Sequence, residues 1–262
     1  MGLKYKCLSV VTVVAILLIT TLAVTACGSK PLRVLFIGNQ LTSFWDFPLQ
    51  VEAMALDLGA VPEIETEAST KSAVGLTYHI SPEYSDTLDI IRTGGFNIVV
   101  IQGSIRDPVE NPENFLKNAQ ILANEAKAVG AEVVFYETWV YDPKGTTVKL
   151  TKVYEKSWSG GNPGEMQVRI REAYTRAISE AGGRMARVGD AWEKVLTEHP
   201  GIKLHSSTGG SPSECGNYLA ACVFVNVLTN LDPRDAEWRS EGVSEEEAVI
   251  LRAAAWEVRN KI

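Results

Sequence analysis

The sequence predicts an α/β fold in which a parallel sheet is covered by helices on both faces. Short runs rich in β-branched residues alternate along the chain with longer amphipathic segments, as they do where helices connect parallel strands. Glycines follow two of the amphipathic segments, at Gly130 and at Gly182-Gly183, where helices commonly end in a left-handed conformation. No internal repeat or low-complexity linker interrupts the alternation. The pattern indicates one domain of the parallel α/β class.

The predicted elements follow from this alternation in chain order. The β-branched runs place strands at residues 33–37, 63–67, 97–102, 132–137 and 184–188. The amphipathic segments place helices at residues 49–58, 85–93, 111–129, 165–181, 191–198, 214–228 and 244–260. The last helix is expected to pack on the sheet and close the domain, because it has one apolar stripe formed by Ala248, Leu251, Ala255 and Val258.

Ligands of parallel sheets bind at the carboxyl ends of the strands, so the loops that follow the strands are where chemistry is expected. The one long irregular stretch among them covers residues 141–164. A loop of that length is either a lid over a ligand or an ordinary surface excursion.

The first 26 residues have the pattern of an export signal. Lys4 and Lys6 precede a run without charges from Cys7 to Ala26, and Cys27 follows directly. A cysteine after Val-Thr-Ala resembles a bacterial lipobox, in which the cysteine is lipidated and becomes the mature amino terminus. We therefore expect a signal peptide at residues 1–26, a lipidated Cys27 with a short linker at 27–32, and a domain at 33–262. An uncleaved transmembrane anchor is the alternative, and both tether the domain to a membrane outside the cytoplasm.

The composition argues against several classes of partner and site. The net charge is −7, and removal of residues 1–26 would take away two lysines and no acid. Such a negatively charged chain is not expected to bind nucleic acid, or to bind anionic lipid through a polybasic segment. Three histidines without a Cys/His cluster predict no zinc site, and we expect no cofactor. Cys215 and Cys222 are expected to be two buried hydrophobic residues, or a disulfide if Cys215 precedes the helix.

Five short blocks lie at the predicted strand ends and in the later helices. They read GNQLT (38–42), VVIQGS (99–104), ETW (137–139), RVGDAW (187–192) and SPSECGNYLAAC (211–222). In this order they resemble blocks of the SGNH (GDSL-like) hydrolases, over most of the chain after the leader. The resemblance implies a three-layer α/β/α sandwich with a parallel five-stranded sheet, similar to flavodoxin, which agrees with the alternation of strands and helices.

The resemblance also implies a serine-esterase site, and the sequence departs from it at each reactive position. The family's nucleophilic serine falls on Gln40, its aspartate on Thr208 and its histidine on Ser211. An amide is a poor nucleophile, a serine hydroxyl is no general base near neutral pH, and threonine has no charge to orient an imidazole. The sequence therefore predicts a membrane-tethered, catalytically inactive relative that binds a carbohydrate, an acyl ester or a partner protein.

Two alternatives remain open at this point. The chain is an active ester hydrolase if Ser43 or Ser104 replaces the nucleophile and His205 or His79 replaces the base. Alternatively, the domain is purely architectural. Ser43 is expected to cap a helix, and His79 to make structural hydrogen bonds.

The oxyanion side of the predicted site is better preserved. Gln102 and Gly103 stand where amide donors would hold a developing negative charge, and Ser104 and Gln40 are further ligand-binding candidates. The simpler interpretation is that these polar groups only satisfy one another.

Overall fold

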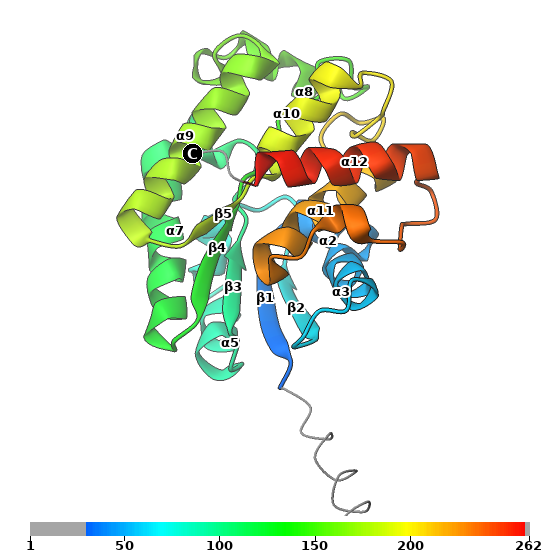
Figure 1. Ribbon diagram of the computed structural model, residues 1–262. Coiled ribbons are helices and arrows are strands. Elements are labelled where there is room, and N and C mark those ends of the chain that lie inside the picture. The colour runs from blue at the N-terminus through cyan, green and yellow to red at the C-terminus, as the bar shows by residue number, and fades with distance from the viewer. Residues whose placement is uncertain (1–29, 260–262) are drawn as a thin grey trace, which may run out of the picture.

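The computed structural model describes residues 30–259 and contains the expected parallel sheet (Figure 1). Its strand order is β2-β1-β3-β4-β5, and every neighbouring pair is parallel. The strands are β1 Leu32–Gly38, β2 Ile64–Thr70, β3 Ile98–Ile101, β4 Glu132–Tyr136 and β5 Arg184–Ala186. The prediction of fold class is confirmed, and each predicted strand is present with ends that differ by a few residues.

Helices cover the sheet on both faces, which makes the domain a three-layer α/β/α sandwich (Figure 1). One face carries α3 Phe47–Asp57, α10 Val188–Glu198, α11 Glu214–Thr229 and α12 Glu245–Val258, and the other carries α5 Thr87–Thr93, α7 Pro112–Ala128 and α9 Pro163–Ala181. The shorter elements are α2 Gln40–Ser43, η1 Phe44–Asp46, α4 Leu76–His79, α6 Asp107–Glu110, α8 Val148–Thr151, η2 Lys152–Glu155, η3 Ser157–Ser159 and η4 Pro233–Asp235. All seven long helices were predicted, and the short ones were not.

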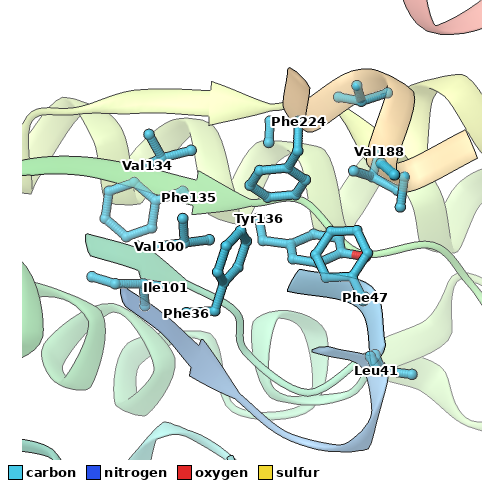
Figure 2. Packing of buried hydrophobic residues seen from close by; sticks show 14 of the residues in the cluster. Phe36, Leu41, Phe47, Val100, Ile101, Val134, Phe135, Tyr136, Val188 and Phe224 are labelled. Carbon is cyan, nitrogen blue, oxygen red and sulfur yellow. The ribbon is translucent and has the colours of Figure 1, made fainter. Parts of the chain in front are cut away.

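A cluster of aromatic rings joins α3 and α11 to the sheet (Figure 2). Phe36 of β1, Tyr136 of β4, Phe47 of α3 and Phe224 of α11 are fully buried. Their contacting rings have centroids 4.9–5.7 Å apart, mostly edge to face, which is the favoured geometry for aromatic pairs. The cluster lies directly below the carboxyl end of β1 and fixes the backbone that leads to residue 40.

The carboxy-terminal helix α12 packs differently from the prediction. Its apolar stripe is buried as expected, but its main contacts are with α10 and α11 rather than with the strands. The reason is that α11, with nearly every residue buried, already occupies the face of the sheet. The helix begins with a capping box between Ser244 and Glu247.

Cys215 and Cys222 both lie in α11 as free, buried thiols, so the hydrophobic interpretation is confirmed. Burial raises the pKa of Cys215 to about 12, which leaves it unreactive at neutral pH. Within residues 30–259, no helix has the length and apolarity needed to cross a bilayer. The predicted signal peptide and Cys27 lie outside the described residues.

A buried group of charges attaches α9 and α10 to the end of β4. Glu137 is fully buried, and its Oε1 accepts a hydrogen bond from Nε2 of Gln167 at 3.0 Å. Asp190, also buried, pairs with Arg171 and Arg187, and Arg171 also reaches Glu193. Arg171 lies 3.7 Å from the same Oε1 of Glu137. Burial, together with the charge of Asp190, raises the pKa of Glu137 to about 8.

The protonation of Glu137 makes stability depend on pH. Because the pKa rises from 4.5 to about 8 on folding, the folded chain binds this proton more tightly than the unfolded chain. The free energy of unfolding therefore decreases between about pH 5 and pH 8, on the order of a few kcal/mol, and levels off above that range. Glu137→Gln is expected to remove this decrease, as measured by urea unfolding at several pH values. Glu65→Gln, at an exposed position of β2, is the control. Equal slopes for the two variants would contradict the assignment.

Candidate functional site

The turn after β1 is held by the buried amide of Gln102. Its Oε1 accepts hydrogen bonds from the backbone N–H of Asn39 and from Oγ1 of Thr42, both at 2.9 Å. Gly38 is required here, because a Cβ at this position would lie 2.3 Å from the same oxygen. Asn39 caps α2 through the N–H of Leu41 at 3.0 Å. These contacts place Gln40 as the first residue of a helix at the strand's carboxyl end.

His79 supports the turn from below. It is buried, its Nε2–H donates to the carbonyl of Gly38 at 2.8 Å, and its Nδ1 accepts from Oγ1 of Thr87 at 2.9 Å. Burial lowers the pKa of His79, so the ring is neutral at physiological pH. Both ring nitrogens are occupied by these contacts, which favours the structural role over that of a substitute base.

The three positions that correspond to the family's reactive residues meet at one hollow. Gln40, Thr208 and Ser211 all line it, together with Ser104, and its volume is about 500 Å³. Gln40 comes from the start of α2, Ser104 from the loop after β3, and the other two from the loop before α11. The hollow opens at the carboxyl ends of the strands, where the parallel sheet predicts a ligand site. We refer to it as the β1–β3 pocket.

The Gln40 amide is partly engaged. Its Oε1 accepts a hydrogen bond of 2.7 Å from the backbone N–H of Ala73, a residue with a left-handed φ of 61°. This bond ties residues 73–75, which border the pocket, to α2. The NH₂ group of Gln40 carries the hydrogens that remain available to a ligand.

The loop that carries Thr208 and Ser211 is a tight turn closed by the antiparallel bridge between His205 and Pro212. Ser206 N–H donates to the carbonyl of Ser211 at 2.9 Å, and the Thr208 hydroxyl lies 2.8 Å from that of Ser206. Thr208 is exposed at the tip of the turn.

The long stretch at residues 141–164 holds this loop in place. Asp142 N–H donates to Gly209 O at 2.8 Å, and Thr146 N–H donates to Ser207 O at 2.9 Å. The two backbones touch so closely that a Cβ on Gly209 would lie 2.9 Å from Cα of Gly145. Tyr141 and Leu150 from the same stretch line the pocket. One part of the stretch is therefore a wall of the pocket and a brace for the loop.

His205 is turned away from the pocket. Its Nε2–H donates to Val140 O at 2.7 Å, and its ring packs edge to face on Trp192 with centroids 4.8 Å apart. It lines a separate hollow of about 370 Å³ beside Lys144 and Lys203. Burial lowers its pKa. This geometry does not favour a substitute base at His205, because the ring lies on the other side of the loop from the β1–β3 pocket.

The polar groups of Gln102 and Gly103 are engaged within the protein. Gln102 is buried and its NH₂ donates to Gly103 O, while Gly103 N–H donates to the hydroxyl of Tyr174 at 3.1 Å. A Cβ at Gly103 would lie 2.7 Å from the ring of Phe115, so the backbone is enclosed. These contacts favour the simpler interpretation, since the polar groups of Gln102 and Gly103 pair within the layer beneath the pocket.

The serines proposed as substitute nucleophiles have other positions. Ser43 is exposed at the end of α2 and makes no capping hydrogen bond, because Asn39 caps that helix. Ser104 lines the pocket, and its Oγ accepts from the N–H of Asp107 at 3.1 Å, at the start of α6. Among the hydrogen bonds of residues 30–259, no imidazole contacts either serine.

Charged residues of the pocket were missed by the sequence analysis. Arg106, Asp107 and Glu110 line it beside Tyr141. Arg106 pairs with Glu110 at 2.6 Å and lies over the ring of Trp158. The sequence does contain a pattern that could have located them. Asp107-Pro108, just after the third strand, is typical of a helix start, and a helix there would place these residues at the carboxyl end of that strand. In the described part of the chain, no group of three or more His, Cys, Asp or Glu side chains has the geometry to hold a metal ion.

Comparison with solved structures shows that this architecture is shared. A protein of Slackia heliotrinireducens assigned to the SGNH hydrolases is 26% identical, with a TM-score of 0.63 over 75% of this chain and 98% of that one. A DUF4886 family protein of Bacteroides uniformis is 14% identical, with a TM-score of 0.68 over 87% and 95%. The lipase/acylhydrolase of Enterococcus faecalis is 14% identical, with a TM-score of 0.54 over 76% and 95%. No family model and no curated protein matches the sequence.

His79 should contribute to stability rather than to reactivity. His79→Ala removes two buried hydrogen bonds, one to the carbonyl of Gly38 and one to the hydroxyl of Thr87, so we expect a loss of about 1–3 kcal/mol in the free energy of unfolding. His199→Ala, at an exposed helix end, is the control and should change stability by less than about 0.5 kcal/mol. Similar small losses in both variants, measured by urea unfolding, would show that His79 does not hold the turn.

Proposed function

The chain has the fold of the SGNH hydrolases, and we propose that it is an inactive member of that fold group which binds a glycan in the β1–β3 pocket. The observation that supports this most directly is the convergence of Gln40, Thr208 and Ser211 on one pocket. The three positions therefore still meet, while the groups that would attack and transfer a proton are replaced.

The chemistry of the pocket supports inactivity. The hydroxyls of Ser104 and Ser211 border the pocket, but a hydroxyl needs an adjacent base to become a nucleophile. The two buried or half-buried imidazoles of the domain, His79 and His205, donate to backbone carbonyls elsewhere. In subtilisin, loss of the triad lowers turnover by about a million-fold, and the remainder comes from binding and oxyanion contacts.

The polar groups of the pocket fit a neutral, hydroxyl-rich ligand. Gln40 supplies NH₂ donors, Ser104 and Ser211 supply groups that both donate and accept, and Asp107 supplies an acceptor. Sugar hydroxyls also both donate and accept, so they pair with either kind. Arg106 is already paired with Glu110, and the whole chain carries a charge of −7, which disfavours a polyanion.

The proposal includes a membrane tether. Its support is the basic start, the uncharged run at residues 7–26 and the Cys27 that follows, which fit export and lipidation. A domain anchored in this way outside the cytoplasm would meet the glycans of the cell envelope.

Inactivity has a direct test. Full-length protein in detergent is expected to give no acetyl-ester hydrolysis above buffer and no mass increase with a serine-directed phosphonate. The triple variant Gln40→Ser, Thr208→Asp, Ser211→His rebuilds the reactive groups on the same turns, and should gain both turnover and covalent labelling. Turnover by the unmodified protein that disappears in Ser104→Ala would refute the proposal in favour of an active hydrolase with substitute residues.

Binding can be measured separately from turnover. We expect neutral oligosaccharides to raise the melting temperature in a saturable manner, since a ligand of the native state stabilises it by mass action. Gln40→Ala removes the amide donors and should weaken binding about tenfold, whereas Lys71→Ala, an exposed neighbour outside the pocket, should not. The absence of any saturable shift would favour the purely architectural alternative.

A further inference from the structure

The segment between α2 and α3 has an unusual backbone. Trp45 and Asp46 both have left-handed φ angles, 55° and 50°, in succession. The left-handed region favours glycine and, among other residues, asparagine and aspartate, whereas a bulky side chain there is a true outlier. Such strain persists only where the surroundings impose it, and it concentrates at ligand-binding positions.

The strained segment exposes aromatic surface. Trp45 is 48% exposed and Phe44 is 38% exposed, although Leu41 before them and Phe47 after them are buried. The hydrophobic core therefore anchors the segment on each side and leaves the indole outside.

The indole is nevertheless fixed. Its Nε1–H donates to the carbonyl of Pro212 at 3.3 Å, and the Trp45 carbonyl accepts from Nε2 of Gln50 at 2.9 Å. Gln50 is itself held by the hydroxyl of Ser240, which donates to its Oε1 at 3.1 Å. An exposed ring with this support has little conformational entropy to lose when a ligand packs on it.

The ring contacts a segment that borders the β1–β3 pocket. Pro212, which accepts the indole hydrogen bond, directly follows Ser211, and Ser211 lines the pocket. Leu41, four residues before Trp45 in the chain, lines it as well. The indole is therefore placed next to the pocket, where a ligand that extends past Ser211 could reach it.

We propose that Trp45 is a stacking platform for a second sugar ring of a glycan whose first ring occupies the β1–β3 pocket. This rests on the proposed glycan-binding function and specifies it, because it requires an oligosaccharide rather than a single sugar. A pyranose presents an apolar C–H face and a rim of hydroxyls. The face packs on the indole, and the exposed carboxylate of Asp46 beside it accepts from the hydroxyls.

The surroundings of the ring favour a sugar over an acyl chain. An acyl chain needs a continuous apolar channel from the pocket, but Arg106, Asp107, Glu110 and Ser104 form much of the pocket lining. A membrane surface is disfavoured by Asp46 and by the negative charge of the chain.

The test uses full-length protein in detergent and a panel of neutral oligosaccharides, chito-, cello-, manno- and xylohexaose, with the corresponding monosaccharides. Binding is followed by thermal shift and by tryptophan fluorescence. The hexasaccharide that binds unmodified protein is expected to bind Trp45→Ala about tenfold more weakly, with the monosaccharide unchanged. Trp45→Phe should retain most of the affinity, because it keeps a stacking face. Tyr84→Ala, an exposed aromatic in a different hollow, is the matched control and should bind normally.

The variant Trp45→Asn gives a readout that a structural role of Trp45 would not produce. Asparagine tolerates the left-handed conformation, so this variant should have an unchanged or higher melting temperature together with the loss in affinity. A clearly lower melting temperature would mean that the indole serves packing, and would overturn the proposal. Equal hexasaccharide affinity in Trp45→Ala and unmodified protein would overturn the platform and leave glycan binding by the pocket intact. If no sugar of the panel binds unmodified protein, both the platform and the glycan-binding function are refuted.

Discussion

The site depends on one buried amide. The side-chain oxygen of Gln102 accepts from Asn39 and Thr42, and the absence of a Cβ at Gly38 lets the two strands approach closely enough for these bonds. Loss of the amide would leave buried donors unpaired, which is more costly than the net gain of any single hydrogen bond. This contact sets the turn after β1, and with it the helix α2 and the position of residue 40. The buried layer beneath the pocket therefore determines where the pocket residues lie.

This layering explains how reactive groups can be replaced while the fold persists. Gly38, Asn39, His79 and Gln102 are buried and joined by hydrogen bonds, so a substitution there affects folding. Gln40, Thr208 and Ser211 are at the surface of the pocket, where a change of side chain leaves few buried groups unpaired. The resemblance to hydrolases is therefore retained by residues that serve stability, and it carries little information about catalysis.

The same division sets what the sequence could predict. The periodicity of apolar residues located every strand and every long helix, because an element that buries one face repeats its apolar residues at a fixed spacing. Two helices begin earlier than predicted, because Pro48 and Pro163 occupy their first turns. That residues 40, 208 and 211 lie at one site could be expected from the sequence, because the ordered blocks resemble those that carry the reactive residues of the hydrolases. The direction of a side chain did not follow: Gln102 points into the protein and His205 to the far side of its loop, and each direction is decided by a partner distant in sequence. The charged wall at Arg106–Glu110 was missed because a four-residue helix is too short to have a period.

A pocket without a chemical step is under a different physical requirement from an enzyme site. An enzyme gains rate only from contacts that are stronger in the transition state than in the ground state, so it cannot bind its substrate as tightly as its geometry permits. Without a nucleophile that restriction is lifted, and contacts with the resting ligand become useful. Gln40 fits this requirement, since it uses its oxygen to fix the pocket edge at Ala73 and retains two hydrogens for a ligand. The proposed platform at Trp45 fits it as well, because the surroundings that impose the strained backbone also hold the exposed indole in one position, ready for a resting ligand.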